Sequence, residues 1–101
     1  MRIITLKRLV ESAAKHAALR PKVEFWYSVA KAARWRTLAG TRASFRHADQ
    51  VTVESGRTVT VFNLGDAYRL ITAIHYNKER IYILRVLTHA EYDKGTWKDT
   101  L

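Results

Sequence analysis

Three side chains have types and spacing suited to RNA cleavage: Arg69, His89 and Tyr92. Histidine transfers protons near neutral pH, tyrosine donates a proton or stacks on a base, and arginine holds a phosphate through two hydrogen bonds. Attack of an RNA 2′-hydroxyl on its neighbouring phosphate, without a metal, needs a base, an acid and cations that stabilise the developing charge. Residue types alone leave each of the three open to a functional or a structural role.

Three more residues are candidates for contacts with RNA: Asn63, Arg85 and Lys94. Asn63 ends the strand that turns back into Arg69, and Lys94 follows Tyr92 in a short helix. Arg85 interrupts an otherwise apolar strand. It must be paired or functional, because an unpaired buried guanidinium is costly.

The candidates also have structural alternatives. Arg69 and Arg85 could form ion pairs with Glu54, Glu91 or Asp93. His89 could simply face solvent at the start of a helix. Packing is the preferred interpretation for the other aromatic or imidazole side chains of the strands, namely Tyr68, Tyr76, Tyr82 and His75.

Familiar catalytic motifs are absent from the sequence. It has no cysteine, no Gly-rich phosphate loop, no His-Glu-x-x-His and no nucleophile elbow. The four histidines show no spacing typical of metal ligands. We therefore expect neither a metal nor a cofactor.

Residues 81–94 position His89 and Tyr92. The first seven residues are mostly apolar and predict a buried strand. Thr88 and Glu91 then have the spacing of a capping box, so a short helix should begin at Thr88. The two candidate side chains are thereby placed just beyond a strand end.

The remainder of the chain predicts helices followed by strands. Residues 1–5 suit a short strand, and Thr5 could cap a helix over 6–18. Pro21 suits the first turn of a second helix that runs to about Ala33. One or two helical turns are expected around residue 40. From Gln50 onward, apolar residues recur at every second position, which predicts an antiparallel meander. Helices followed by such strands predict an α+β fold. The length predicts one domain, residues 1–101.

The positive charge is confined to one half of the chain. Residues 1–47 contain 11 Lys or Arg and two Asp or Glu, whereas residues 48–101 contain seven of each, so the whole net charge of +9 lies in the first half. This asymmetry favours a polyanionic partner, with nucleic acid ahead of a membrane. No run of apolar residues predicts a membrane span or an export signal, so the cytoplasm is the expected location.

An ordered series of motifs covers the C-terminal half. It comprises Thr60-Val61-Phe62-Asn63-Leu64-Gly65, Tyr68-Arg69-Leu70-Ile71, Ile74-His75-Tyr76-Asn77, Tyr82-Ile83, Val86-Leu87-Thr88-His89-Ala90-Glu91-Tyr92-Asp93-Lys94 and Trp97. The N-terminal half agrees in pattern at Met1-Arg2-Ile3-Ile4, Trp26-Tyr27, Trp35, Phe45 and Ala48-Asp49. In these motifs the chain resembles the HigB-type toxins of the RelE superfamily, which are ribosome-dependent mRNA interferases of bacterial type II toxin–antitoxin modules.

The resemblance implies a RelE-like fold, with N-terminal helices packed on one face of a twisted antiparallel sheet and a short C-terminal helix. The other face would form an RNA-binding concavity. The implied activity is endoribonuclease cleavage of mRNA on the ribosome. The implied partner is a HigA-type antitoxin, usually a helix-turn-helix protein, through which the complex would contact DNA indirectly.

The resemblance also implies roles for the candidate residues. An arginine that follows a tyrosine on a central strand helps to hold the phosphate, and Arg69 occupies that place. A basic residue at the end of the last strand and a tyrosine in the terminal helix are best matched by His89 and Tyr92. Several RelE-like toxins carry lysines on the preceding strand, where this chain has Val59, Val61 and Asn63. The identity of the general base is therefore open, and His89 becomes the stronger candidate. The alternative is a non-catalytic RNA- or antitoxin-binding module of the same fold.

Overall fold

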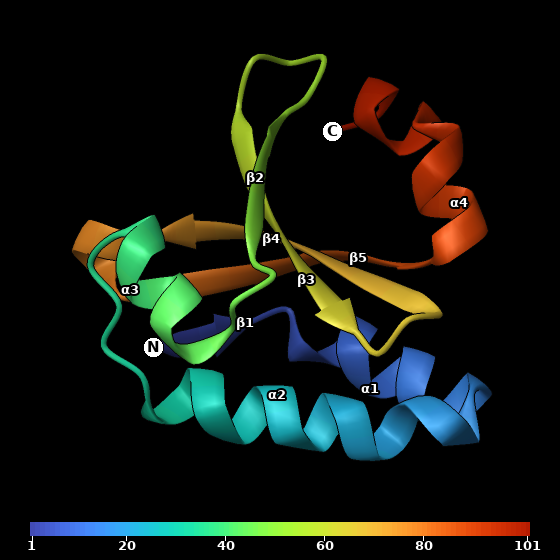
Figure 1. The fold of residues 1–101 in the computed structure, drawn as a ribbon, viewed down its shortest axis with the longest axis horizontal. Helices are drawn as coiled ribbons and strands as arrows, with labels where there is room; N and C mark the ends of the chain where they lie inside the picture. The colour runs from blue at the N-terminus through green and yellow to red at the C-terminus, as the bar shows by residue number, and fades with distance from the viewer.

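Helices cover one face of a five-stranded sheet in the computed structural model, which describes residues 1–101 (Figure 1). The strand order is β1-β5-β4-β3-β2. The strands are β1 (Arg2–Ile4), β2 (Asp49–Thr52), β3 (Thr58–Leu64), β4 (Tyr68–His75) and β5 (Arg80–Thr88). The helices are α1 (Leu6–Lys15), α2 (Arg20–Ala32), α3 (Leu38–Ser44) and α4 (His89–Lys94). The predicted α+β class is confirmed.

The sheet is mixed, which corrects the expectation of a purely antiparallel one. Strands β2 to β5 form the predicted antiparallel meander. Strand β1 instead pairs in parallel with β5, with Arg2 opposite Arg80. A strand of three residues carries no local signal for its direction, because that direction depends on where α1 and α2 take the chain.

Thr5 does not cap α1, contrary to the sequence-based expectation. Its backbone is left-handed, with φ at 62°, and its side chain makes no capping hydrogen bond. Its hydroxyl instead donates to the carbonyl of Ile83 at 2.7 Å and accepts from the N–H of Ile83 at 3.0 Å. Thr5 therefore extends the contact between β1 and β5 up to the start of the helix.

The first two helices lie together beneath the sheet. Helix α1 ends at Lys15, earlier than predicted, and a 3₁₀ turn at Ala17–Leu19 leads into α2. Pro21 lies in the first turn of α2, as expected. Helix α1 buries only part of its apolar surface, because Leu9 is fully buried whereas Val10 is 56% exposed.

Each face of the sheet carries its own hydrophobic core. The core beneath the helices includes Trp26, Leu9, Phe62, Leu70 and Ile83. The core on the opposite face includes Val59, Val61, Ile71, Leu87 and Trp97.

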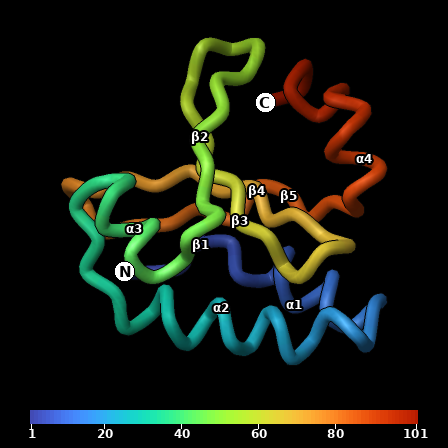
Figure 2. The backbone as a smooth tube through the Cα atoms, in the orientation of Figure 1, coloured from blue at the N-terminus to red at the C-terminus, as the bar shows by residue number.

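The C-terminal segment closes the second core. A 3₁₀ turn at Thr96–Asp99 follows α4. The N–H of Glu54 donates to the carbonyl of Lys98 at 3.0 Å, and the hydroxyl of Ser55 donates to the carbonyl of Leu101 at 2.6 Å. The β2–β3 hairpin and the C-terminal segment thus stand together on the side of the sheet away from α1 and α2 (Figure 2).

Candidate functional site

The start of α4 is fixed by the predicted capping box. The hydroxyl of Thr88 accepts from the N–H of Glu91 at 3.2 Å, and the carboxylate of Glu91 accepts from the N–H of Thr88 at 2.9 Å. Two hydrogen bonds lower the pKa of Glu91. The bond from the backbone N–H of Thr88 has the larger effect, and the bond with the Thr88 side chain adds to it. The N–H of His89 donates to the carbonyl of Ala67 at 2.8 Å, so the helix start is also attached to the β3–β4 turn.

Arg69 lies at the beginning of β4 and its side chain is held by main-chain oxygens. Its Nη1 donates to the carbonyls of Gly65, Asp66 and Tyr68 at 3.2, 3.1 and 2.9 Å. No carboxylate pairs with this guanidinium, and Nε and Nη2 donate to no protein acceptor. The half-buried cation therefore keeps hydrogen-bond donors for an anionic ligand.

Tyr92 is half-buried and oriented by Trp97. The two rings are stacked, with centroids 5.4 Å apart and planes 20° apart, and the indole N–H of Trp97 donates to the carbonyl of Tyr92 at 3.0 Å. Burial raises the pKa of the Tyr92 phenol, and the charges of Asp49 and Asp93 add to that effect while Arg69 opposes it. The phenol therefore stays protonated at neutral pH and can act as a hydrogen-bond or proton donor.

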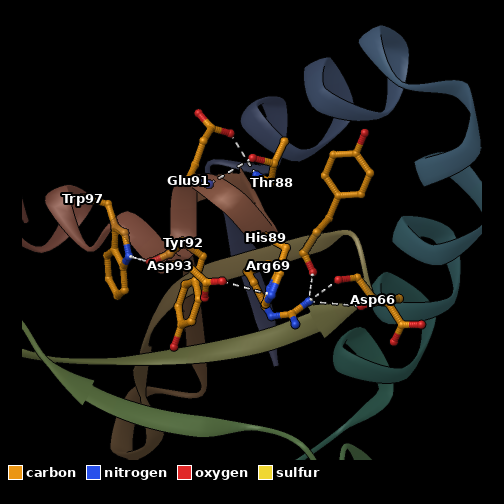
Figure 3. A network of polar contacts seen from close by, with 10 residues as sticks. Asp66, Arg69, Thr88, His89, Glu91, Tyr92, Asp93 and Trp97 are labelled. Carbon is orange, nitrogen blue, oxygen red and sulfur yellow. Dashed lines mark hydrogen bonds and ion pairs between the residues drawn. The ribbon is translucent and has the colours of Figure 1, made fainter.

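His89 faces the same region from the first turn of α4. Its Nε2 lies 3.1 Å from Oδ2 of Asp93, one turn later in the helix. The side chain is 53% exposed, so it remains accessible to a ligand. Figure 3 shows Arg69, His89, Tyr92 and Asp93 on one side of the helix start, with Thr88 and Glu91 on the other and the phenol of Tyr92 pointing toward the strands.

The six candidates predicted from the sequence fall into two groups. Asn63 is exposed and lies directly across from Arg69 in the β3–β4 register, so it adjoins the group formed by Arg69, His89 and Tyr92.

Arg85 and Lys94 form the second group. They line a cavity of about 420 Å³ together with Glu91 and Trp97, and no residue of the first group lines it. Arg85 nevertheless lies on the same face of the sheet as Arg69, because it is opposite Ile71 in the β4–β5 register.

The structural alternatives have separate outcomes. Neither Arg69 nor Arg85 forms the ion pairs considered from the sequence, because the four ion pairs of the structure involve other residues. His89 is exposed but paired. Packing is confirmed for Tyr68 and Tyr76, which rest against the core beneath the helices, and the ring of Tyr82 packs edge-on to His75 at 5.1 Å.

Sequence reasoning missed two acidic residues, Asp49 and Asp93, as possible members of the site. Asp93 was considered only as a partner for arginine, although its spacing of four residues from His89 on a helix signals a contact. Asp49 lies at the start of β2, opposite Val61, and its effect on Tyr92 arises from strand pairing that no local pattern reveals.

The site is therefore a cluster of general acid–base and cationic groups. No set of three or more His, Cys, Asp or Glu side chains is arranged to hold a metal ion. The cluster combines an arginine with free donors, a neutral phenol and an imidazole paired with a carboxylate. Such groups can hold a phosphate and move protons at its oxygens.

Comparison with known proteins identifies the family. No curated protein matches the chain, and no helix is long and apolar enough to cross a membrane. A family of HigB toxins, described as the RelE-like toxic component of a toxin–antitoxin system, matches residues 19–95. That match covers well over half of the chain, includes the whole cluster and implies an antitoxin as partner. The chain thus belongs to the HigB family of RelE-like toxins.

Proposed function

We propose that this toxin is an endoribonuclease that cuts mRNA on the ribosome by metal-independent attack of a 2′-hydroxyl on the adjacent phosphate. The observation that carries the proposal is the way in which the guanidinium of Arg69 is held. Its Nη1 is held by three carbonyls, while its remaining N–H groups point to no protein acceptor. A guanidinium fixed in this way is preorganised to bind a phosphate and to stabilise the added negative charge of the transition state.

The neighbouring residues supply the proton transfers. His89 takes the proton of the 2′-hydroxyl while the O2′–P bond forms, and Asp93 stabilises the resulting imidazolium. As the P–O5′ bond breaks, Tyr92 gives its proton to the leaving 5′-oxygen. The products are a 2′,3′-cyclic phosphate and a free 5′-hydroxyl, and the phenol regains a proton from His89 through solvent.

The charge of the N-terminal half supports the ribosome as the place of action. Three ion pairs use Lys7, Arg20 and Arg42 of that half. Eight other basic residues are exposed and have no carboxylate partner: Arg2, Arg8, Lys15, Lys22, Lys31, Arg34, Arg36 and Arg46. Such a surface suits the phosphates of ribosomal RNA. The toxin would then act in the cytoplasm, with a HigA-type helix-turn-helix antitoxin as its inhibitor.

Expression without an antitoxin tests the proposal. The wild-type chain should arrest growth and produce cuts in translated mRNA that primer extension can map. Arg69→Ala and His89→Ala should abolish both effects. His75→Ala is the matched control, because His75 is exposed at the opposite end of β4. Growth arrest without any cut would favour a binding module over an enzyme, and full activity of both site variants would refute the assignment.

A further inference from the structure

A second cavity lies beside the cluster, at the end of β3. Its volume is about 300 Å³. It opens between the first turns of α2, the β3–β4 turn and Phe45, which directly follows α3. Its lining includes Lys22, Phe25, Trp26, Phe45, Asn63 and Gly65.

The cavity carries an unusual exposed aromatic ring. Phe25 is 64% exposed and is one of only two large hydrophobic residues left exposed in the chain. Its ring meets that of Phe45 edge-on, with centroids 6.4 Å apart and planes at 89°. This contact steadies the ring, and the exposure of Phe25 leaves it accessible to a flat ligand that can stack on it.

Polar groups without partners line the same cavity. The side chain of Asn63 is exposed at the rim and makes no hydrogen bond within the protein; like Val61 and Arg69, it lies on the face of the sheet away from α2. The indole N–H of Trp26 is buried and has no acceptor. The other two indoles both have one, since Trp35 donates to Ser44 and Trp97 to Tyr92. Buried donors without an acceptor are rare in folded proteins.

A cation connects the cavity with Arg69. The side chain of Lys22 lies against Gly65, where an added Cβ would come within 2.7 Å of Lys22 Cε. Gly65 has φ at +68°, and its carbonyl also accepts from Nη1 of Arg69. The two basic side chains therefore contact the same turn residue, one from the cavity and one from the site.

The cavity also lies at an open sheet edge. Strand β2 pairs with β3 only as far as Asp49 opposite Val61. The last three residues of β3 therefore have no strand beside them on that edge, so a chain that leaves the site past Asn63 meets no obstacle from the sheet.

We propose that this cavity binds an unpaired base of the RNA, from a nucleotide that flanks the phosphate held by Arg69. Phe25 stacks on the base, Lys22 contacts the linking phosphate, and the amide of Asn63, on the Arg69 face of β3, hydrogen-bonds to the RNA where it passes the sheet edge. The combination of an aromatic face, an amide and a cation matches a nucleotide and is continuous with the site. The inference rests on the proposed function in that it takes RNA as the substrate.

A binding experiment on the full chain tests the subsite apart from catalysis. The probe is a short single-stranded oligoribonucleotide with 2′-O-methyl riboses, which cannot be cleaved by 2′-hydroxyl attack. Phe25→Ala should weaken binding by roughly 5- to 100-fold, as expected for the loss of one stacked base, and Phe25→Trp should restore it. Val10→Ala is the matched control, because Val10 is the other large exposed hydrophobic residue. Equal affinities of Phe25→Ala and the wild type would overturn the proposal.

Removal of a base from the RNA gives the complementary test. One abasic position should lower the affinity of the wild type to that of Phe25→Ala and should not weaken Phe25→Ala further. If no abasic position lowers the affinity of the wild type in this way, the proposed base-binding cavity is refuted. Weaker antitoxin binding by Phe25→Ala, with RNA binding unchanged, would instead assign the cavity to a protein partner and also overturn it.

The kinetic signature separates the two proposals. In cleavage of translated mRNA, Phe25→Ala should raise KM and keep kcat, whereas Arg69→Ala should lower kcat. Failure of the wild type to cleave would refute the proposed function, while the uncleavable RNA would still report on the cavity.

Discussion

Nε2 of His89 lies 3.1 Å from Oδ2 of Asp93, one turn further along α4. The contact orients the imidazole and can stabilise its protonated form after it has taken a proton. Both side chains are more than half exposed, so the pair contributes little to folding. Its value lies in the placement of the proposed base.

Loss of the Asp93 charge should therefore impair catalysis while leaving the fold intact. Asp93→Asn should lower kcat by about 10- to 100-fold, the range expected when a hydrogen bond to a charged group is weakened. Asp99→Asn is the control, because Asp99 is exposed and forms no ion pair. Single-turnover cleavage and thermal unfolding of the variants provide the measurements. A lower melting temperature with unchanged kcat would show that the pair is structural.

Arg69→Lys should behave as a non-conservative change. An ammonium group cannot both replace the contacts of Nη1 with three carbonyls and offer a planar pair of donors to phosphate. We expect cleavage to fall by at least about 10-fold. Arg80→Lys is the matched control and should retain full activity, since Arg80 begins β5 opposite His75, at the end of the strand away from α4. A larger loss in Arg80→Lys than in Arg69→Lys would contradict the position of the site.

The sequence predicted the parts of this site whose geometry is local. The capping box of Thr88 and Glu91 sets the start of α4, and helical spacing then brings His89 and Tyr92 to one side. The side chains of β4 alternate between the two faces of the sheet, and a short turn connects β3 to β4. Together these features place Arg69 beside Asn63.

The parts that depend on distant contacts could not be predicted in the same way. Thr5 looked like a cap because hydroxyl residues usually cap helices, but β5 offers Ile83 as a better partner. Arg85 and Lys94 line a cavity with Glu91 and Trp97, and that grouping depends on how the C-terminal segment folds back over β5, which no local pattern reveals.

Tyr92 should titrate later than an ordinary tyrosine. Its pKa is raised from 10.0, first by burial and then by Asp49 and Asp93, so the neutral phenol persists below the raised value and is lost only above it. The absorbance of phenolate, measured as the difference between the wild type and Tyr92→Phe, should appear above pH 10.0. Cleavage that needs the phenol proton should decline over the same range. Ionisation of Tyr92 below that pH would contradict this account.

The capping box should contribute measurable, pH-dependent stability. Thr88→Ala should lower the free energy of unfolding by about 0.5–2 kcal/mol. Because the pKa of Glu91 is lowered from 4.5, the stabilisation from its carboxylate is present above 4.5 and is lost as the pH falls through the depressed value.

Urea denaturation at several pH values can measure the effect of Glu91. Glu91→Gln should remove this part of the acid sensitivity. Glu24→Gln serves as control, because Glu24 is an exposed carboxylate in a surface ion pair. An identical pH dependence in Glu91→Gln and the wild type would be inconsistent with the role of the box.

Association with ribosomes should weaken as salt is added. The unpaired basic residues of the helical half would release counterions from RNA, so the logarithm of the affinity should fall linearly with the logarithm of the salt concentration. Lys31→Gln combined with Arg34→Gln should reduce that slope, since both side chains are exposed and unpaired. Sedimentation with purified ribosomes can measure it. An affinity that is the same at low and high salt would disprove electrostatic docking.

The parallel pairing of β1 with β5 has a consequence for synthesis of the toxin. Arg2 pairs with Arg80, and β5 lies between β1 and β4 in the sheet. Emerging chains fold as their segments leave the ribosome, but contacts between distant segments must wait for the later one. A nascent chain that stops before residue 94 therefore lacks a completed α4 against β4, and with it the pairing of His89 with Asp93 beside Arg69. If translated mRNA is the substrate, as proposed, the ribosome that makes this toxin should be protected from it until that last helix has emerged.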